Sequence, residues 1–185
     1  MNISTDKAAD PISILGKSKL LSERLTATMG KINPKTRYMS VRFGNVFGSR
    51  GSVLHTFRRQ IELGGPITLT DMNVTRYFMT VEEAIHLVIF TASNNFSGET
   101  IILKMGEPIK ILEIAEKLIS ACNKDIKIEV RGLMPGEKLH EQLIGKNESI
   151  LESNFSDLIR IKVDPLPIEK LDDLTDIKIR NLMAN

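Results

Sequence analysis

Hydrophobic and polar positions along this chain follow two different periods. Short β-compatible runs, some apolar throughout and one, residues 125–130, alternating polar and apolar, predict strands, and longer stretches with apolar residues three and four apart predict helices. The strand-like runs are residues 2–5, 38–43, 66–70, 100–103, 125–130 and 158–163. The helix-like stretches are residues 10–29, 53–63, 109–122 and 137–144, one that opens at Thr80, and a last pattern from Pro167. Strands that alternate with helices predict an α/β fold with a parallel sheet.

Local signals predict where some of these elements begin and end. Asp10 followed by Pro11 is a favourable N-cap and first-turn pair, so the first helix is expected to begin there and to stop at Gly30. Thr80 and Glu83 have the spacing of a capping box, which predicts the start of a second helix. Residues 75–77, just before it, are expected to form a loop.

Polar side chains follow the first two predicted strands. Thr5, Asp6 and Lys7 stand at the end of the first strand, and Asn45 stands after the second. In parallel α/β sheets, ligands bind in the crevice beyond the carboxyl ends of the strands. We therefore expect these residues to face a binding crevice, and Lys19 to reach toward it from the first helix.

Composition limits the class of protein. The chain has 185 residues, 42% of them hydrophobic, which is enough to bury the core of one domain or slightly more. Lys and Arg number 25 against 23 Asp and Glu, and the two signs are interspersed, which argues against a nucleic-acid partner. No apolar run approaches the ~20 residues of a membrane helix, and no signal peptide opens the chain. We expect a soluble, cytoplasmic protein.

The cysteine and histidine residues indicate neither a disulfide nor a metal site. Cys122 is the single cysteine and falls on an apolar helical pattern, so it is expected to be a buried, inert thiol. The three histidines are expected on three different helices without the spacing of metal ligands: His55, His86 and His140.

A series of short motifs in order carries a family resemblance. Ser4-Thr5-Asp6-Lys7-Ala8 precedes a helix with Leu15 and Lys19 at the spacing of a Tyr-x-x-x-Lys pair. The later motifs are Val41-Arg-Phe-Gly-Asn-Val46, Gly51-Ser-Val53, Gly65-Pro-Ile-Thr68, Thr75-Arg-Tyr-Phe-Met79, Met105-Gly-Glu-Pro108 and Pro135-Gly-Glu-Lys138. The set resembles the extended short-chain dehydrogenase/reductases and, within them, the UDP-N-acetylglucosamine 4,6-dehydratases of bacterial polysaccharide biosynthesis.

The resemblance implies part of a larger fold. It suggests the C-terminal part of an NAD(P)-binding Rossmann-like fold with an interleaved small α/β substrate-binding lobe. Residues 1–50 would be Rossmann strands and the catalytic helix, 51–145 the lobe with returning Rossmann elements, and 146–185 a C-terminal extension. The Gly-rich turn that holds the NAD pyrophosphate in this family does not occur in the chain. We therefore expect the N-terminal half of the fold to be missing, with a partner chain as one source of it.

The resemblance also assigns catalytic and cofactor roles. Dehydration across C5 and C6 of a hexose needs a base for the C5 proton and an acid for the C6 hydroxyl. The family gives the acid role to the position of Asp6 and the base role to that of Lys7, with Thr5 bonded to the sugar O4. Lys19 would bind the nicotinamide ribose of NAD, and Ser4 and Phe43 are the other expected cofactor contacts.

Leu15 departs from the pattern, because most of the superfamily has Tyr there to take the O4 proton. The retaining branch of these dehydratases usually has Met, so an apolar residue is compatible with activity but leaves the C4 base unassigned.

For the UDP-sugar, Arg76 is the expected diphosphate ligand, since a planar guanidinium can bind two oxygens at once. The other expected substrate contacts are Asn45, Ser52, Val53, Thr68, Leu69, Glu137 and Lys138, several of them through the backbone. Met134 stands where the family commonly has a further Arg.

Other interpretations of the same residues stay open. Asp6 and Lys7 could form a surface ion pair, as adjacent charges often do. The chain could be a non-catalytic fragment that binds a nucleotide sugar or a partner, or a relative of the nucleotide-sugar 4-epimerases. The resemblance also allows a homo-oligomer. The intact Thr5-Asp6-Lys7 motif favours a dehydratase, because an epimerase needs the Tyr and has no use for the Asp-Lys pair.

Overall fold

The computed structural model describes residues 1–49 and 51–167, so the helical pattern expected from Pro167 lies outside the described residues apart from its first position. The described chain forms two compact units. Unit 1 contains residues 1–43, 85–104 and 142–167, and unit 2 contains the described parts of 44–84 and 105–141. Residues 85–104, which lie within the range 51–145, belong to unit 1.

Unit 1 is built on a five-stranded sheet in the order β1-β2-β7-β11-β10. Strands β1 (Asn2–Thr5), β2 (Ser40–Phe43) and β7 (Glu99–Leu103) are parallel. Strands β11 (Leu158–Lys162) and β10 (Ser149–Leu151) pair antiparallel beyond them. Residues 149–162 therefore add two strands to the sheet beyond β7.

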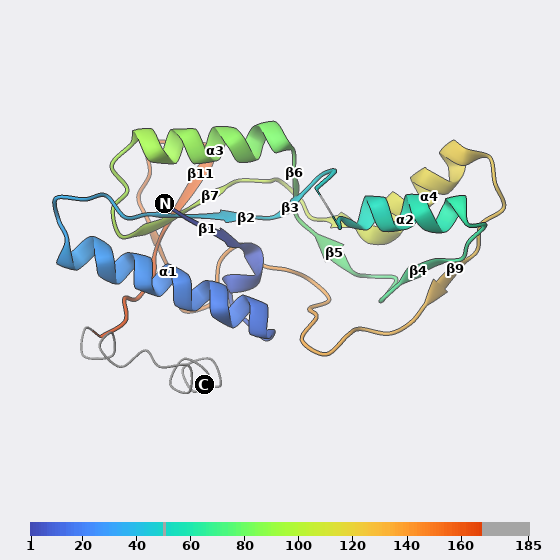
Figure 1. Ribbon diagram of the computed structural model, residues 1–185, viewed down its shortest axis with the longest axis horizontal. Helices are drawn as coiled ribbons and strands as arrows, with labels where there is room; N and C mark the ends of the chain where they lie inside the picture. The colour runs from blue at the N-terminus through green and yellow to red at the C-terminus, as the bar shows by residue number, and fades with distance from the viewer. Residues whose placement is uncertain (50, 168–185) are drawn as a thin grey trace. The chain divides into compact units, whose positions relative to one another are not determined.

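Two helices cover this sheet. Helix α1 (Ile14–Ile32) and helix α3 (Val81–Ser93), most of which belongs to unit 1, lie on opposite faces (Figure 1). Parallel neighbours require such crossover connections, and strands buried on both faces read as continuous apolar runs. Val41 and Ile101 are fully buried in neighbouring strands, which confirms the expected α/β class and the buried strands.

The expected limits of α1 were wrong at both ends. The N-cap is Ser13, whose side chain accepts a hydrogen bond from the Gly16 N–H, whereas Asp10 lies before the helix with φ of 44°. Ser13 competes for the cap because its hydroxyl suits that position as well as a carboxylate does. Gly30 stays within the helix, where a Cβ would approach the Gly98 nitrogen to 3.0 Å. That glycine serves close packing rather than helix termination.

Unit 2 packs two helices over short strands. Helices α2 (Val53–Glu62) and α4 (Ile111–Cys122) accompany a parallel pair, β4 (Ile67–Leu69) with β9 (Ile128–Val130). Two further pairs are β3 (Asn45–Val46) with β6 (Phe78–Met79), and β5 (Thr75–Arg76) with β8 (Ile109–Lys110). The core includes Phe57, Ile61, Ile67, Leu69, Ile111 and Ala115.

Three sequence-based predictions fail in unit 2. Residues 75–77 begin with a strand rather than a loop, and residues 137–144 form no helix. Both differences have one cause, since the Thr75 N–H donates to the Leu139 carbonyl and holds that segment extended beside β5. Cys122 is exposed because it is the last residue of α4, beyond the buried positions of that helix.

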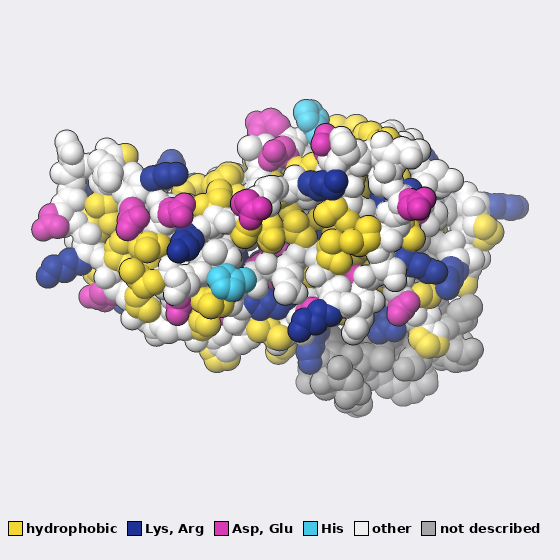
Figure 2. Space-filling view, turned by 180° about the vertical axis from the view of Figure 1, so that it is seen from behind, with side chains coloured by type: hydrophobic (Ala, Val, Ile, Leu, Met, Phe, Trp, Pro, Cys, Tyr) yellow, Lys and Arg dark blue, Asp and Glu magenta, His cyan; other side chains and the backbone are white. Residues whose placement is uncertain are grey.

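The face that Figure 2 shows has no large patch of side chains with one sign of charge. Lys and Arg side chains are interspersed there with Asp and Glu. Among the described residues, no helix has both the length and the apolar character that crossing a bilayer requires.

Candidate functional site

The first set of candidate residues lies at the carboxyl ends of β1 and β2. The two strands pair in parallel with Thr5 opposite Phe43, so both ends reach the same edge of the sheet. The chain then turns through a single 3-10 helix, η1 (Asp6–Ala8), whose N-cap is Thr5. This turn brings the predicted catalytic residues together.

The Asp6 carboxylate is the centre of this set. Asp6 is fully buried, and its Oδ1 accepts hydrogen bonds from Thr5 Oγ1 at 2.9 Å and from Lys7 Nζ at 3.0 Å. Its Oδ2 is buried without a hydrogen bond from any described residue. A solvated surface pair would have two exposed partners, so the interpretation of Asp6 and Lys7 as such a pair is wrong. Two polar groups, the Thr5 hydroxyl and the Lys7 ammonium, therefore converge on one buried oxygen.

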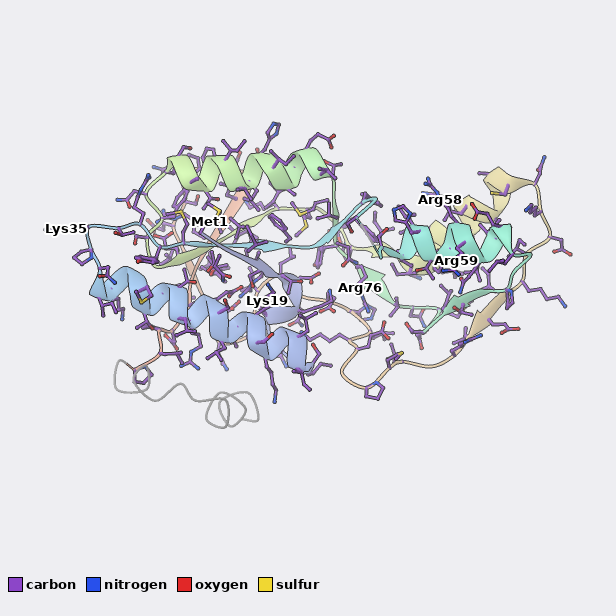
Figure 3. The ribbon with its side chains drawn as sticks, viewed as in Figure 1. Met1, Lys19, Lys35, Arg58, Arg59 and Arg76 are labelled. Carbon is purple, nitrogen blue, oxygen red and sulfur yellow. The ribbon has the colours of Figure 1, made fainter. Side chains whose placement is uncertain are left out.

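Helix α1 packs closely against this turn at Gly16. A Cβ at Gly16 would overlap the Lys7 carbonyl oxygen and lie 3.0 Å from Pro11 Cβ, so only glycine permits the contact. Lys19 lies one turn further along α1 and donates from Nζ to the Ile3 carbonyl at 3.1 Å (Figure 3). Leu15 precedes the glycine, and 54% of its surface is exposed. The helix therefore brings Lys19 to β1, while the Leu15 side chain offers no proton-transfer group.

Ser4 and Phe43 flank the turn on the strands. The Ser4 hydroxyl is buried and has no hydrogen bond with a described residue, and Phe43 is half-buried. Buried polar atoms normally have partners, so this orphan hydroxyl is an atom that a bound molecule or a water would satisfy.

Charged residues that sequence reasoning missed lie beneath this edge of the sheet. Arg42, on β2, is fully buried and pairs through Nη2 with Glu23 of α1 at 2.6 Å and with Glu148 at 2.7 Å. Burial opposes the Arg42 charge, but the hydrogen bonds that Arg42 donates to Glu148 and the charge of Glu23 outweigh it and raise the pKa of the guanidinium above its ordinary value. The sequence did hold a signal, because Arg42 interrupts an apolar strand and a buried charge requires a partner.

The second set lies in unit 2, around Arg76 of β5. Its Nη1 donates to the Thr75 carbonyl at 2.7 Å and to the Leu139 carbonyl at 3.2 Å, and its Nη2 donates to Glu137 Oε1 at 2.8 Å (Figure 3). Glu137 Oε1 also accepts from the Thr70 hydroxyl at 3.0 Å. The structure thus brings the predicted residues Arg76 and Glu137 together. Of the five guanidinium N–H groups, Nε–H and one on Nη2 have no acceptor among the described residues.

Thr70 and His140 belong to this second set but were missed. The Thr75 hydroxyl and His140 Nδ1 are 2.9 Å apart, so a histidine that was expected on a helix lies beside β5. Lys138 Nζ lies 3.8 Å from Glu141 Oε2. These contacts depend on the extended course of residues 137–141, which the sequence pattern had assigned to a helix.

Three other predicted substrate residues of unit 2 already use their side chains or backbone in contacts within the protein. Leu69 is buried in the core, so its side chain is not free for a ligand. Its backbone carbonyl already accepts a hydrogen bond from the Arg131 N–H. Val53 packs against the same core. Thr68 exchanges two hydrogen bonds with the Gln60 side chain, at 2.8 and 3.1 Å.

Two residues of unit 2 keep polar side-chain atoms without protein partners. The Ser52 hydroxyl is buried at the start of α2 and makes no hydrogen bond with a described residue. Asn45 uses its backbone N–H to bond the Tyr77 carbonyl, and its side chain makes no hydrogen bond within the described chain. Both are chemically available to a ligand. Across residues 1–49 and 51–167, no group of three or more His, Cys, Asp or Glu residues is arranged to hold a metal ion.

Curated proteins similar to this chain act in polysaccharide synthesis or on nucleotide sugars. The chain is 43% identical over 182 residues to the capsular polysaccharide biosynthesis protein CapD of Staphylococcus aureus, covering 97% of this chain and 30% of that protein. It is 32% identical over 183 residues to a UDP-N-acetylglucosamine 4,6-dehydratase (inverting) of Campylobacter jejuni, covering 97% and 52%. The chain therefore spans between about a third and a half of the length of these relatives.

Solved structures share its fold. Pen from Bacillus thuringiensis superposes with a TM-score of 0.79 at 34% identity, over 93% of this chain and 60% of that one. A UDP-glucuronic acid 4-epimerase from Bacillus cereus, in complex with UDP-glucuronic acid and NAD, superposes with a TM-score of 0.66 at 26% identity, over 75% and 50%. The family of polysaccharide biosynthesis proteins matches residues 1–163. With its Rossmann-like α/β fold, the chain belongs to this family within the short-chain dehydrogenase/reductases.

Proposed function

We propose that this chain carries the catalytic and sugar-binding residues of an NAD-dependent UDP-N-acetylglucosamine 4,6-dehydratase. The observation that supports this most is the Asp6 carboxylate, fully buried, with the Lys7 ammonium group 3.0 Å from its Oδ1. Elimination of water from a hexose needs an acid and a base close together, and this pair supplies both. The dehydratase from Campylobacter jejuni is a relative over almost the whole chain.

The pair can reach the required protonation states by itself. One proton moved from Lys7 Nζ to Asp6 Oδ1, along their hydrogen bond, converts the ion pair into a neutral amine and a carboxylic acid. The amine then takes the C5 proton of the sugar, and the acid gives its proton to the departing C6 hydroxyl, which leaves as water. Both residues return to their starting charges. No proton needs to be exchanged with solvent during the elimination.

The residues beside the pair fit the nicotinamide end of NAD. Lys19 Nζ uses one N–H on the Ile3 carbonyl, and the buried Ser4 hydroxyl has no partner among the described residues, so both can bind a ribose or an amide. Phe43 ends the neighbouring strand and would contact the same group. NAD, when bound, supplies hydride transfer from C4 of the sugar and back to C6. Thr5 would hold the sugar O4 through its hydroxyl.

In unit 2, Arg76 would bind the diphosphate of the UDP-sugar. Its Nε–H and one N–H on Nη2 have no acceptor among the described residues, and a guanidinium can bind two anionic oxygens at once. Glu137 holds the guanidinium through Nη2. Asn45, Ser52 and Thr68, the backbone of Val53, and Lys138 would complete the sugar and uridine contacts.

A UDP-sugar 4-epimerase is the alternative activity, because such enzymes share the fold. Leu15 argues against it, since the position that would carry the proton-transferring Tyr has an apolar side chain. A binding fragment without chemistry is the other alternative.

The test uses a chimera in which this chain replaces the matching segment of the Campylobacter dehydratase. The chimera is expected to convert UDP-N-acetylglucosamine to a product that has lost one water, as detected by mass spectrometry. Asp6→Asn should lower the rate roughly 10²- to 10⁴-fold, the effect of removing a general acid, without changing nucleotide-sugar binding.

Asp125→Asn is the matched control, because Asp125 is exposed in unit 2 and the same chemical change there should not alter the rate. Equal rates for Asp6→Asn and Asp125→Asn would refute the acid role of Asp6. A product of unchanged mass with inverted C4 would instead identify an epimerase, and binding without any product would identify a binding fragment.

A further inference from the structure

We propose that residues 143–148 act as a strap that positions the Asp6-Lys7 turn, and that Asp10 is the positioning residue through which the strap acts. The proposal rests on the function proposed above, because it gives that turn its catalytic role. Its physical basis is a continuous series of contacts within unit 1, from the buried Arg42 to the strap and from the strap to Asp10.

Arg42 clamps the strap to the sheet and to α1. Its Nε and Nη2 donate to the two Glu23 oxygens at 3.1 and 2.6 Å. Its Nη1 donates to the Leu143 carbonyl at 2.8 Å and to Glu148 Oε2 at 2.9 Å, and Nη2 donates to Glu148 Oε1 at 2.7 Å. These five bonds match the five N–H groups of a guanidinium. Arg42 therefore binds both ends of the strap and has no donor left over.

One hydrogen bond within the strap joins Gly145 to Glu148, and two others join the strap to Asp10. The Gly145 N–H donates to Glu148 Oε2 at 2.6 Å. The Lys146 N–H donates to both Asp10 oxygens, at 3.1 and 3.0 Å. A Cβ at Gly145 would lie 3.0 Å from Asp10 Oδ1, so the strap approaches Asp10 as closely as a backbone can. The Asp10 carboxylate is thus held by backbone atoms rather than by a mobile side chain.

Asp10 needs this support because its backbone is strained. Its φ of 44° is in the left-handed region, which costs a non-glycine residue free energy and persists only where surrounding contacts impose it. The preceding Ala9 N–H donates to the Asp6 carbonyl at 3.0 Å. The turn from Asp6 to Asp10 is therefore fixed at one end by the pairing of β1 with β2 and at the other by the strap.

The Arg42 clamp is better explained by geometry than by stability. Burying one guanidinium and two carboxylates carries a desolvation cost that well-packed apolar residues would avoid. Apolar residues could not impose directions on the strap backbone, whereas a guanidinium with bidentate partners can. Fixing the Asp6 and Lys7 groups matters because a misplacement of about 1 Å can cost a reaction as much as 10²-fold.

Asp10→Gly separates positioning from folding. Glycine takes a φ of 44° without strain, so the fold should keep its stability while the two bonds from Lys146 are lost. In the chain itself, hydrogen exchange of the amides of residues 7–10 should speed up roughly 10-fold, as expected when local opening becomes easier. In the chimera, kcat should fall roughly 10- to 100-fold with KM for UDP-N-acetylglucosamine unchanged.

Asp10→Asn is the conservative variant, since an amide oxygen can accept from Lys146 and Asn adopts this backbone region about as readily as Asp does. It should restore most of the slow exchange and most of kcat. Asp125→Gly, the same substitution at an exposed position of unit 2, should change neither. If the loss of unfolding free energy in Asp10→Gly is as large as the rise in activation free energy that its loss of kcat represents, Asp10 has a structural role and the proposal is overturned.

Exchange and turnover distinguish the two proposals. Unchanged exchange at residues 7–10 in Asp10→Gly would overturn the strap, whatever the chimera does. Faster exchange with unchanged kcat would overturn the positioning role. In a third outcome, exchange is faster in Asp10→Gly but the chimera with Asp10 intact forms no product. That outcome would support the strap and would refute the dehydratase function.

Discussion

Removing the Arg42 side chain should destabilise this protein more than almost any other single substitution in unit 1. Arg42→Met keeps an unbranched side chain of similar length but leaves the Glu23 carboxylate, whose side chain is 0% exposed, without its cation. Glu148 loses the same partner and is 12% exposed. Breaking a buried pair from one side costs about 3–5 kcal/mol, most of it the penalty of the remaining uncompensated charge.

The magnitude can be checked by melting curves. For a chain of this size, each kcal/mol shifts the melting temperature by about 2–4 °C, so Arg42→Met should melt about 6–20 °C lower. Arg42→Met combined with Glu23→Met should recover at least half of that loss, because the double variant no longer buries a lone carboxylate and Glu148 can reach water. A double variant no more stable than the single one would refute the argument from uncompensated charge.

The pH dependence of this effect has a definite sign. The pKa of Arg42 is raised by folding, so its contribution is complete below the unfolded-state pKa and is lost only as the pH rises through the folded-state pKa. Both values lie above pH 10. The difference in unfolding free energy between the parent and Arg42→Met, from urea denaturation, should therefore not shrink between pH 7 and pH 10. A difference that shrinks over this interval would contradict full ionisation of the guanidinium.

Two further predictions concern the packing of α1 and the unit 2 site. Gly16→Ala should destabilise by about 1–3 kcal/mol in urea denaturation despite the better helix propensity of Ala, because its Cβ overlaps backbone; Gly30→Ala, whose Cβ meets Gly98 at 3.0 Å, should cost less. Arg76→Ala should weaken UDP-sugar binding in calorimetry by roughly 10- to 100-fold, and Met134→Arg should strengthen it. Affinity indifferent to both changes would remove the binding role proposed for unit 2.

The main elements of the fold could be predicted from the sequence because their signals are local. The apolar run around Val41 needed no knowledge of its neighbours to be recognised as a buried strand, and the Thr80-Glu83 capping box is present as expected, with bonds of 2.6 and 3.1 Å. Boundaries were less secure where two local signals competed, as at Asp10 and Ser13. The helix expected at residues 137–144 failed for another reason, since pairing with β5 overrides the local pattern.

In the candidate site too, contacts between neighbours in the sequence could be predicted and contacts between distant residues could not. Asp6 and Lys7 are adjacent in sequence, so their pairing could be expected from the motif alone. Glu23 and Glu148 lie 19 and 106 residues from Arg42, and nothing in the local sequence selects them as its partners. The strap was likewise invisible, because Asp10 and Lys146 are 136 residues apart and the bond uses a backbone amide that any residue could provide.

The orphan polar atoms of this structure support the view that its strand ends are built for a ligand rather than for stability. Ser4 Oγ and Asp6 Oδ2 are buried without hydrogen bonds from described residues, and each such atom costs about 1–3 kcal/mol if nothing satisfies it. The strained backbone of Asp10 adds to that cost within the same few residues. A turn with these features would relax unless stronger contacts prevented it, and the five bonds of Arg42 supply those contacts from outside the turn. The stabilising residue Arg42 is therefore separate from the residues Ser4 and Asp6, whose unpartnered atoms are available to a ligand.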